Sequence, residues 1–121
     1  MRHRVKKYLK FKKKDRDHRD AMIRNLLTSL LEHKAIKTTK KRAKAVSWLV
    51  DRLVRVVNTK DEMNAIRYVW EYVFTKKSSL ELFNIIAKSN SDRQSGITRI
   101  TPIKLRDGDN ATLVQLEIVS C

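Results

Sequence analysis

Five aliphatic residues near the N-terminal end constrain the fold more than any other feature of the sequence. They recur at positions i, i+3, i+4, i+7 and i+8, which fall on one face of an α-helix. The five are Ile23, Leu26, Leu27, Leu30 and Leu31. Asp17 is the expected N-cap, because its carboxylate can accept from free N–H groups, and the helix should close at Lys34. Such an apolar face must be covered, so the other elements are expected to pack around this helix.

A short strand and a second helix should follow. Residues 35–39 alternate β-branched residues with Lys37, which is typical of a strand, and Thr39 can cap a helix over 40–58. The predicted apolar face of that helix comprises Ala43, Val46, Leu49, Val50, Leu53 and Val57. Trp48 lies off this face, and we expect it to pack under a neighbouring element, with functional stacking as the alternative.

Two further helices are predicted before residue 90. Asp61 or Thr59 can cap a third helix that runs to about Phe74, with its aromatic residues in the core. Its expected apolar residues are Met63, Ile66, Tyr68, Val69, Trp70 and Val73. Ser78 and Glu81 have the spacing of a capping box, which predicts a fourth, shorter helix that starts near Ser79 and ends before Asn90.

The sequence becomes β-like after residue 96. Residues 88–96 are turn and loop formers and predict an exposed, mobile connection. Two β-like stretches, 97–105 and 112–119, flank a turn at 106–110 and predict an antiparallel hairpin, with Pro102 on an edge strand or at a bulge. Together with the strand at 35–39 they predict a two-layer α+β fold, in which a small three-stranded sheet packs on helices. The expected order is helix, strand, three helices and two strands.

The distribution of charge divides the chain into two parts. The 121 residues hold 28 Lys and Arg against 13 Asp and Glu, a net charge of +15. Residues 1–44 hold 17 of these cations and 4 acids, so the remaining 77 residues are nearly neutral. This asymmetry predicts phosphate-backbone binding by a polycationic front end. We expect a basic arm at 1–16 and a single globular RNA-binding domain at 17–121.

The arm supplies the first group of candidate RNA-binding residues. It contains nine Lys or Arg and one acid, so we expect it to be disordered in the free protein and ordered by nucleic acid. Tyr8 and Phe11 either stack on bases or dock on the protein's own surface. The candidates of the arm and of the helix that follows are Arg2, His3, Arg4, Lys6, Lys7, Lys10, Lys12, Lys13, Lys14, Arg16, His18, Arg19 and Arg24.

A second group of candidates surrounds the start of the second helix. Four cations fall at this helix N-terminus, where the helix dipole disfavours positive charge, so phosphates are expected there. The candidates of this phosphate clamp are Lys37, Thr38, Thr39, Lys40, Lys41, Arg42 and Lys44. A secondary contact is expected from the region of the hairpin, through Arg93, Arg99, Lys104 and Arg106.

Signals for catalysis, metal binding or membrane insertion are absent from the sequence. The chain has only two glycines, too few for a glycine-rich loop that binds phosphate. Its single cysteine, Cys121, allows no intramolecular disulfide, which suits a reducing compartment. His3 and His18 lack metal-ligand spacing, and the acidic residues around Asp109 are better explained as turn chemistry than as a divalent-ion site. We therefore expect no enzyme activity, catalytic residue, cofactor, metal, small-molecule substrate, signal peptide or membrane span.

Several short motifs, in this order, resemble one family along nearly the whole chain. They are Met1-Arg2-His3-Arg4, His18-Arg19 with Ala21-Met22 and Arg24-Asn25-Leu26, Ile36-Lys37-Thr38-Thr39 with Arg42-Ala43-Lys44, Leu82-Phe83, Gly96 with Thr98-Arg99-Ile100, and Arg106 with Gly108-Asp109-Asn110-Ala111. The family is the bacterial large-subunit ribosomal protein seventeen. The chain departs from it between Lys6 and Lys14, where the family usually has a glycine-containing arm, and has one glycine before Ile97 where relatives often have two.

The resemblance implies a structural constituent of the large ribosomal subunit, without catalytic activity and located in the cytoplasm. Its implied partners are the large-subunit ribosomal RNA and neighbouring ribosomal proteins near the exit-tunnel side. The residues alone leave one alternative open, because phosphate contacts carry no sequence information. An architectural, nucleoid-type DNA-binding protein would also use a basic arm and a helical body.

Overall fold

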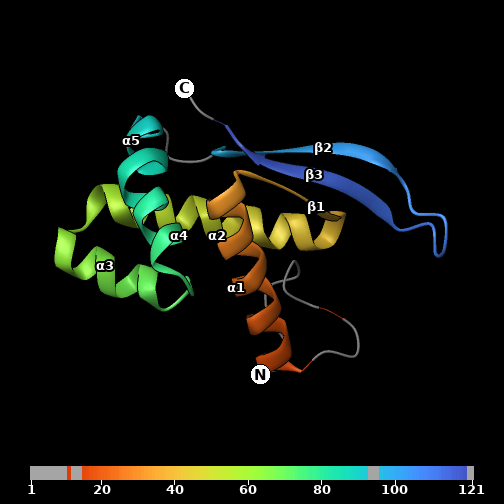
Figure 1. The fold of residues 1–121 in the computed structure, drawn as a ribbon, viewed down its shortest axis with the longest axis horizontal. Helices are drawn as coiled ribbons and strands as arrows, with labels where there is room; N and C mark the ends of the chain where they lie inside the picture. Colours follow the sequence, from red (N-terminus) through yellow and green to blue (C-terminus); the bar gives the residue numbers. More distant parts are fainter. Residues whose placement is uncertain (1–10, 12–14, 93–95, 120–121) are drawn as a thin grey trace, which may run out of the picture.

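The computed structural model describes residues 11, 15–92 and 96–119, which form helices packed on one face of a small sheet (Figure 1). The elements are α1 (Arg16–His33), β1 (Ala35–Thr39), α2 (Lys40–Thr59), α3 (Glu62–Trp70), α4 (Lys76–Glu81), a π-helical segment η2 (Leu82–Ile86), α5 (Ala87–Ser89), β2 (Thr98–Leu105) and β3 (Thr112–Ile118). Because α4, η2 and α5 follow one another without a break, they correspond to the fourth predicted helix. The predicted α+β order is therefore confirmed.

The strand at 35–39 completes the sheet, as predicted. The three strands are antiparallel in the order β1-β3-β2. Ile36 lies opposite Leu116, which lies opposite Ile100, so these three side chains share the face that packs on the helices. Pro102 is on the edge strand β2, where the register shifts between Pro102 and Lys104, so both expectations for this proline are confirmed.

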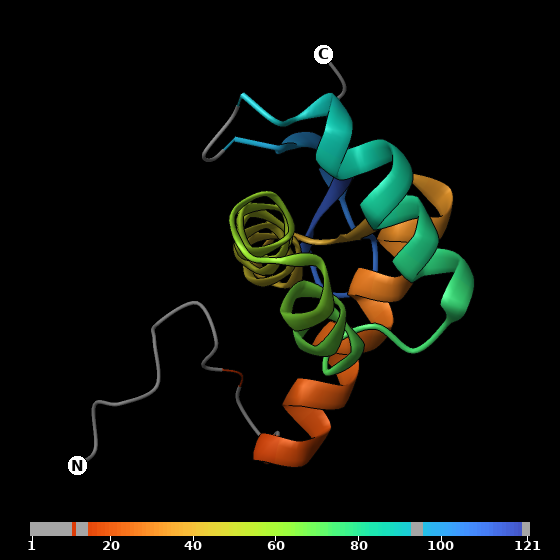
Figure 2. The same cartoon turned by 90° about the vertical axis from the view of Figure 1, so that its left-hand side faces the viewer.

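The core lies between α2 and the sheet and extends to α1 and α4. α2 runs beside the sheet in Figure 1, and Figure 2 looks almost along its axis, with α1 and the α4–α5 segment on one side. Ser47 Oγ lies 2.6 Å from Thr98 Oγ1, and Asp51 Oδ1 accepts the Ile97 N–H at 3.2 Å, which ties α2 to the start of β2. The largest fully buried side chains are Leu27, Leu30, Leu31, Leu53, Leu82, Ile97, Leu116, Val46, Val50, Val54, Val69 and Val114.

The N-cap of α1 is Asp15, and the prediction of Asp17 is wrong. Asp15 has an extended backbone, and its Oδ1 accepts the His18 N–H at 2.8 Å. Asp17 lies in the first turn, where its charge still favours the helix dipole. Both aspartates have the same capping chemistry, so only the backbone direction distinguishes them. The helix closes at Lys34, which adopts a left-handed conformation with φ 66°.

α3 ends at Trp70, short of the predicted end near Phe74, and much of its predicted core is exposed. Its buried residues are Ala65 and Val69. The exposed large apolar side chains of this region are Met63, Ile66, Trp70 and Phe74. α3 packs mainly against α2, which covers only one side of it. The prediction that the aromatic residues here lie in the core is therefore wrong for Trp70 and Phe74.

α4 begins at Lys76 with Thr75 as its N-cap, so the predicted capping box is wrong. Thr75 Oγ1 accepts the Ser78 N–H at 3.2 Å. Ser78 is fully buried, and its Oγ donates to the Thr28 carbonyl of α1 at 3.3 Å. Contact with α1, rather than capping, thus explains this serine.

The connection predicted at 88–96 is only partly a loop. Lys88 and Ser89 belong to α5, and residues 93–95 lie outside the described residues. Asn90 is fully buried, and its Nδ2 donates to the Ile86 carbonyl at 2.9 Å. The expected exposure is therefore wrong at Asn90, because its side chain closes the end of the preceding helix.

Candidate nucleic-acid interface

β1 and the first turn of α2 place a cluster of lysines at the surface. Lys37, Lys40, Lys41 and Lys44 are exposed, and Arg42 is half-buried. The first turn of α2 contains no acidic residue, and its N-cap, Thr39, makes no side-chain capping hydrogen bond. Within the part of the chain that the structure describes, none of the four lysines forms an ion pair. The cations and the free N–H groups of this turn can therefore both donate to the oxygens of an anion.

The cluster continues along α2 as a basic face. Lys41, Lys44, Arg52 and Arg55 lie within about 80° of one another around the helix axis and extend over about 21 Å of its length. Trp48 lies at the centre of the same face. We call these four cations the α2 basic face. Sequence reasoning missed Arg52 and Arg55, although their helical spacing from Lys41 and Lys44 was a readable signal.

Aromatic rings hold one of these cations in place. The Arg52 guanidinium carbon lies 5.4 Å from the centre of the Trp48 ring and 5.6 Å from that of Tyr68. Burial raises the pKa of Tyr68 to about 12, which keeps this phenol in the neutral form that it already has at physiological pH. Trp48 is half-buried against the core, as the packing interpretation predicted.

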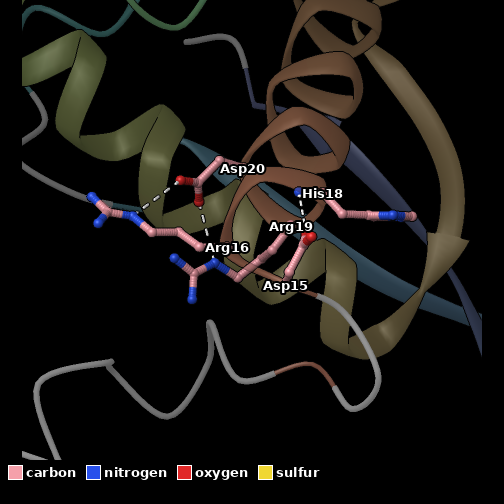
Figure 3. A network of polar contacts seen from close by, with 5 residues as sticks. All are labelled: Asp15, Arg16, His18, Arg19 and Asp20. Atoms are coloured by element: carbon pink, nitrogen blue, oxygen red, sulfur yellow. Dashed lines mark hydrogen bonds and ion pairs between the residues drawn. The ribbon is translucent and has the colours of Figure 1, made fainter.

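The start of α1 contributes two further predicted cations that share one carboxylate. Arg19 Nε donates to Asp20 Oδ1 at 3.2 Å, and Arg16 Nε lies 4.0 Å from Asp20 Oδ2 (Figure 3). Figure 3 shows both arginines directed toward the Asp20 carboxylate, with His18 directed away from them. Residues 15–20 hold three acids and two bases, so the described start of α1 carries no excess of positive charge.

A groove of about 370 Å³ lies between this part of α1 and the α2 basic face. Its lining residues are Asp20, Ile23, Arg24, Ala45, Trp48, Leu49, Arg52, Glu71 and Tyr72. Arg24, a predicted RNA contact, is half-buried, and its guanidinium carbon lies 4.5 Å from the centre of the Phe74 ring. Its Nε is buried and has no hydrogen-bond partner among the described residues. Arg24 thus lines the groove, and its guanidinium lies over the half-exposed Phe74 ring.

The sheet register brings one hairpin residue close to the lysine cluster. Lys104 lies opposite Leu113, and Leu113 lies opposite Thr39, the residue that precedes Lys40. Two strand spacings, about 10 Å, thus separate Lys104 from the start of α2. The predicted clamp and the predicted hairpin contact meet at this point, although 60 residues separate them in the sequence.

The other two predicted hairpin cations that the structure describes are paired with acids. Arg99 Nη2 lies 2.7 Å from Glu117 Oε1 on the neighbouring strand. Arg106 Nη2 lies 2.6 Å from Asp109 Oδ2 across the hairpin turn. The Arg106 guanidinium and the Ala111 N–H lower the pKa of Asp109 to about 2. Asp109 is thereby held as part of the turn.

Two sequence expectations change at the margins of the interface. Thr38 is only 8% exposed, because it lies on the inner face of β1 opposite Val114, so its side chain faces away from the surface that carries the lysines. Phe11 packs against the body of the protein, with Lys41 Nζ 5.0 Å from its ring centre. Of the two alternatives for this aromatic, the structure favours docking on the protein's own surface.

Several predicted residues lie outside the described part of the chain. They are Arg2, His3, Arg4, Lys6, Lys7, Tyr8, Lys10, Lys12, Lys13, Lys14 and Arg93. In the described part, no group of three His, Cys, Asp or Glu residues is arranged to hold a metal ion. No helix there is long and apolar enough to cross a membrane.

Comparisons with known proteins identify one family. Residues 22–119 match the family described as ribosomal protein L17. The chain is 42% identical over 103 residues to the large ribosomal subunit protein bL17 of Desulforudis audaxviator, covering 85% of this chain and 91% of the relative. It is 42% identical over 102 residues to the bL17 protein of Desulforamulus reducens, covering 84% of this chain and 90% of the relative. The bL17 protein of Desulfotalea psychrophila is 38% identical over 102 residues, with coverage of 84% and 78%.

Proposed function

Because this chain belongs to the ribosomal protein L17 family, we propose that it is a structural constituent of the large ribosomal subunit and binds large-subunit rRNA through the α2 basic face. The observation that carries the proposal is the run of exposed cations from Lys37 to Arg55 along β1 and α2. Cations held along one face of a helix can contact successive phosphates of a nucleic-acid backbone.

The candidate residues divide into three contacts. Lys37 and the α2 basic face neutralise phosphates of one RNA strand, and the free N–H groups at the start of α2 donate to an oxygen of one phosphate. The basic arm at residues 1–16 inserts into RNA. Lys104 extends the contact to the hairpin, and Arg99 and Arg106 contribute less because Glu117 and Asp109 already neutralise them.

The function requires no chemistry at the site. The L17 family is a structural, non-enzymatic component of the ribosome. The relatives are named as large ribosomal subunit proteins. We propose that this chain lies beside other large-subunit proteins near the exit-tunnel side, as the resemblance of its motifs implies. This location is a proposal that depends on the family resemblance.

Two measurements test the proposal. Affinity for large-subunit rRNA and for random duplex DNA of the same length is compared at the same salt concentration, because non-specific phosphate binding depends steeply on salt. We expect a clear preference for the rRNA and co-sedimentation of the protein with large subunits through a high-salt gradient. Equal affinity for both nucleic acids, with no co-sedimentation, would instead support an architectural DNA-binding protein.

A further inference from the structure

One side of α3 exposes large apolar side chains at helical spacing. Met63, Ile66 and Trp70 are 63%, 39% and 58% exposed. Their positions i, i+3 and i+7 lie within about 60° around the helix axis, so they form one continuous surface. We call these three residues the α3 apolar patch. A contiguous exposed apolar surface of this kind marks an interaction site far more often than single exposed residues do.

The charge around the patch has the opposite sign to the rest of the protein. Residues 61–74 contain three acids and one base, whereas the chain as a whole carries +15. Asp61, Glu62 and Arg67 line a shallow hollow together with Met63 and Ile66. Within the described residues, neither Asp61 nor Glu62 is engaged in an ion pair. An acidic rim repels phosphates and attracts cationic side chains.

We infer that the α3 apolar patch docks a protein segment that carries Lys or Arg beside apolar residues. Such a segment places its apolar side chains against Met63, Ile66 and Trp70, while its cationic heads reach Asp61 and Glu62, which line the hollow. Lysine and arginine suit this surface because their aliphatic stems cover apolar area and their charged ends stay at the rim. Trp70 is the expected anchor, since tryptophan is enriched among the residues that dominate binding energy.

This inference rests on the proposed place of the chain in the large subunit, where basic protein segments and RNA are both available. α2 then has two functions on different sides, because its basic face binds phosphates and its apolar side carries α3. The matched control is Leu105 on the β2–β3 hairpin, which is 59% exposed, much like Trp70, but lies next to Lys104 and Arg106.

The test is photo-crosslinking in large subunits purified from cells that express the full chain. A benzophenone amino acid replaces Trp70 in one variant and Leu105 in the other. We expect position 70 to crosslink to a protein peptide with Lys or Arg within a few residues, and position 105 to crosslink to rRNA. Crosslinks from position 70 to rRNA or to a second copy of this chain, or no crosslink at all in assembled subunits, would overturn the inference.

A charge variant tests the acidic rim separately. Glu62→Lys should lower the crosslinking yield from position 70 by about two- to fivefold, because an attractive contact becomes repulsive. The yield from position 105 should not change. An unchanged yield at position 70 would show that the rim does not select the partner. Failure of every variant to enter large subunits would instead contradict the proposed function, so the two failures are distinguishable.

Discussion

The α2 basic face predicts a specific change in the salt dependence of RNA binding. Each neutralised phosphate contributes roughly 0.7–0.9 units to the slope of log affinity against log salt. Replacing Lys41, Lys44, Arg52 and Arg55 with Gln should therefore flatten the slope by about three units. Over a fourfold rise in salt concentration, the affinity of the parent should then fall by about 60-fold more than that of the variant.

The assay is binding of large-subunit rRNA at a series of salt concentrations, with circular dichroism to check the fold. The chain offers a matched control in four exposed cations elsewhere, namely Arg67, Lys76, Lys77 and Lys88. Both quadruple variants reduce the net charge from +15 to +11. We expect the control variant to keep nearly the parental slope, because counterions are released only where cations meet phosphates.

Two results would refute this reasoning. If both variants flatten the slope of log affinity against log salt equally, total charge governs binding and the α2 basic face does not. Parental slopes in both variants would mean that α2 presents a solvated face and that RNA binds elsewhere. Arg52 contacts Trp48 and Tyr68 and so contributes to packing. If the first variant does not fold, a triple variant that keeps Arg52 replaces it in the binding assay.

Four further predictions concern stability and the arm. Leu27→Ala should lower the free energy of unfolding by about 2–5 kcal/mol, measured by urea denaturation, because this side chain is fully buried. Asp15→Ala should cost about 1 kcal/mol through loss of the helix cap, measured in the same way. Arg106→Ala should raise the pKa of Asp109 from about 2 toward its ordinary value of 3.8, measured by NMR titration. Because folding lowers this pKa, the stabilisation from ionised Asp109 is present above pH 3.8 and lost as the pH falls toward 2. Deleting residues 1–14 should leave a cooperative thermal transition and lower the affinity for RNA, because the core lies in later residues.

Each of these predictions has a contrary outcome. A loss from Leu27→Ala no larger than that from exposed Lys41→Ala would place the core of α1 elsewhere. A larger loss from Asp17→Ala than from Asp15→Ala would reverse the assignment of the cap. An unchanged Asp109 pKa would show that Arg106 does not hold this carboxylate, and a non-cooperative transition after the deletion would make the arm part of the fold.

The sequence by itself determined the elements and the location of the charge. Apolar spacing placed α1 and α2 to within about two residues, because a helix that packs on one side must repeat its apolar residues at the helical period. Alternation in residues 112–118 and the proline at 102 placed the hairpin and its edge strand for the equivalent reason in a sheet. The excess of cations before residue 45 indicated a polyanion partner, because the net charge of a segment follows from its residue types alone.

Only the tertiary structure decided which side of each element is covered. Met63, Ile66 and Trp70 have the same hydropathy as core residues, but α3 lies at the margin of the helical layer, so they remain exposed. The sheet register brought Lys104 to the start of α2 and placed the Thr38 side chain on the inner face of β1. A local pattern specifies the period of an element, whereas the burial of each face depends on neighbours that are distant in the sequence.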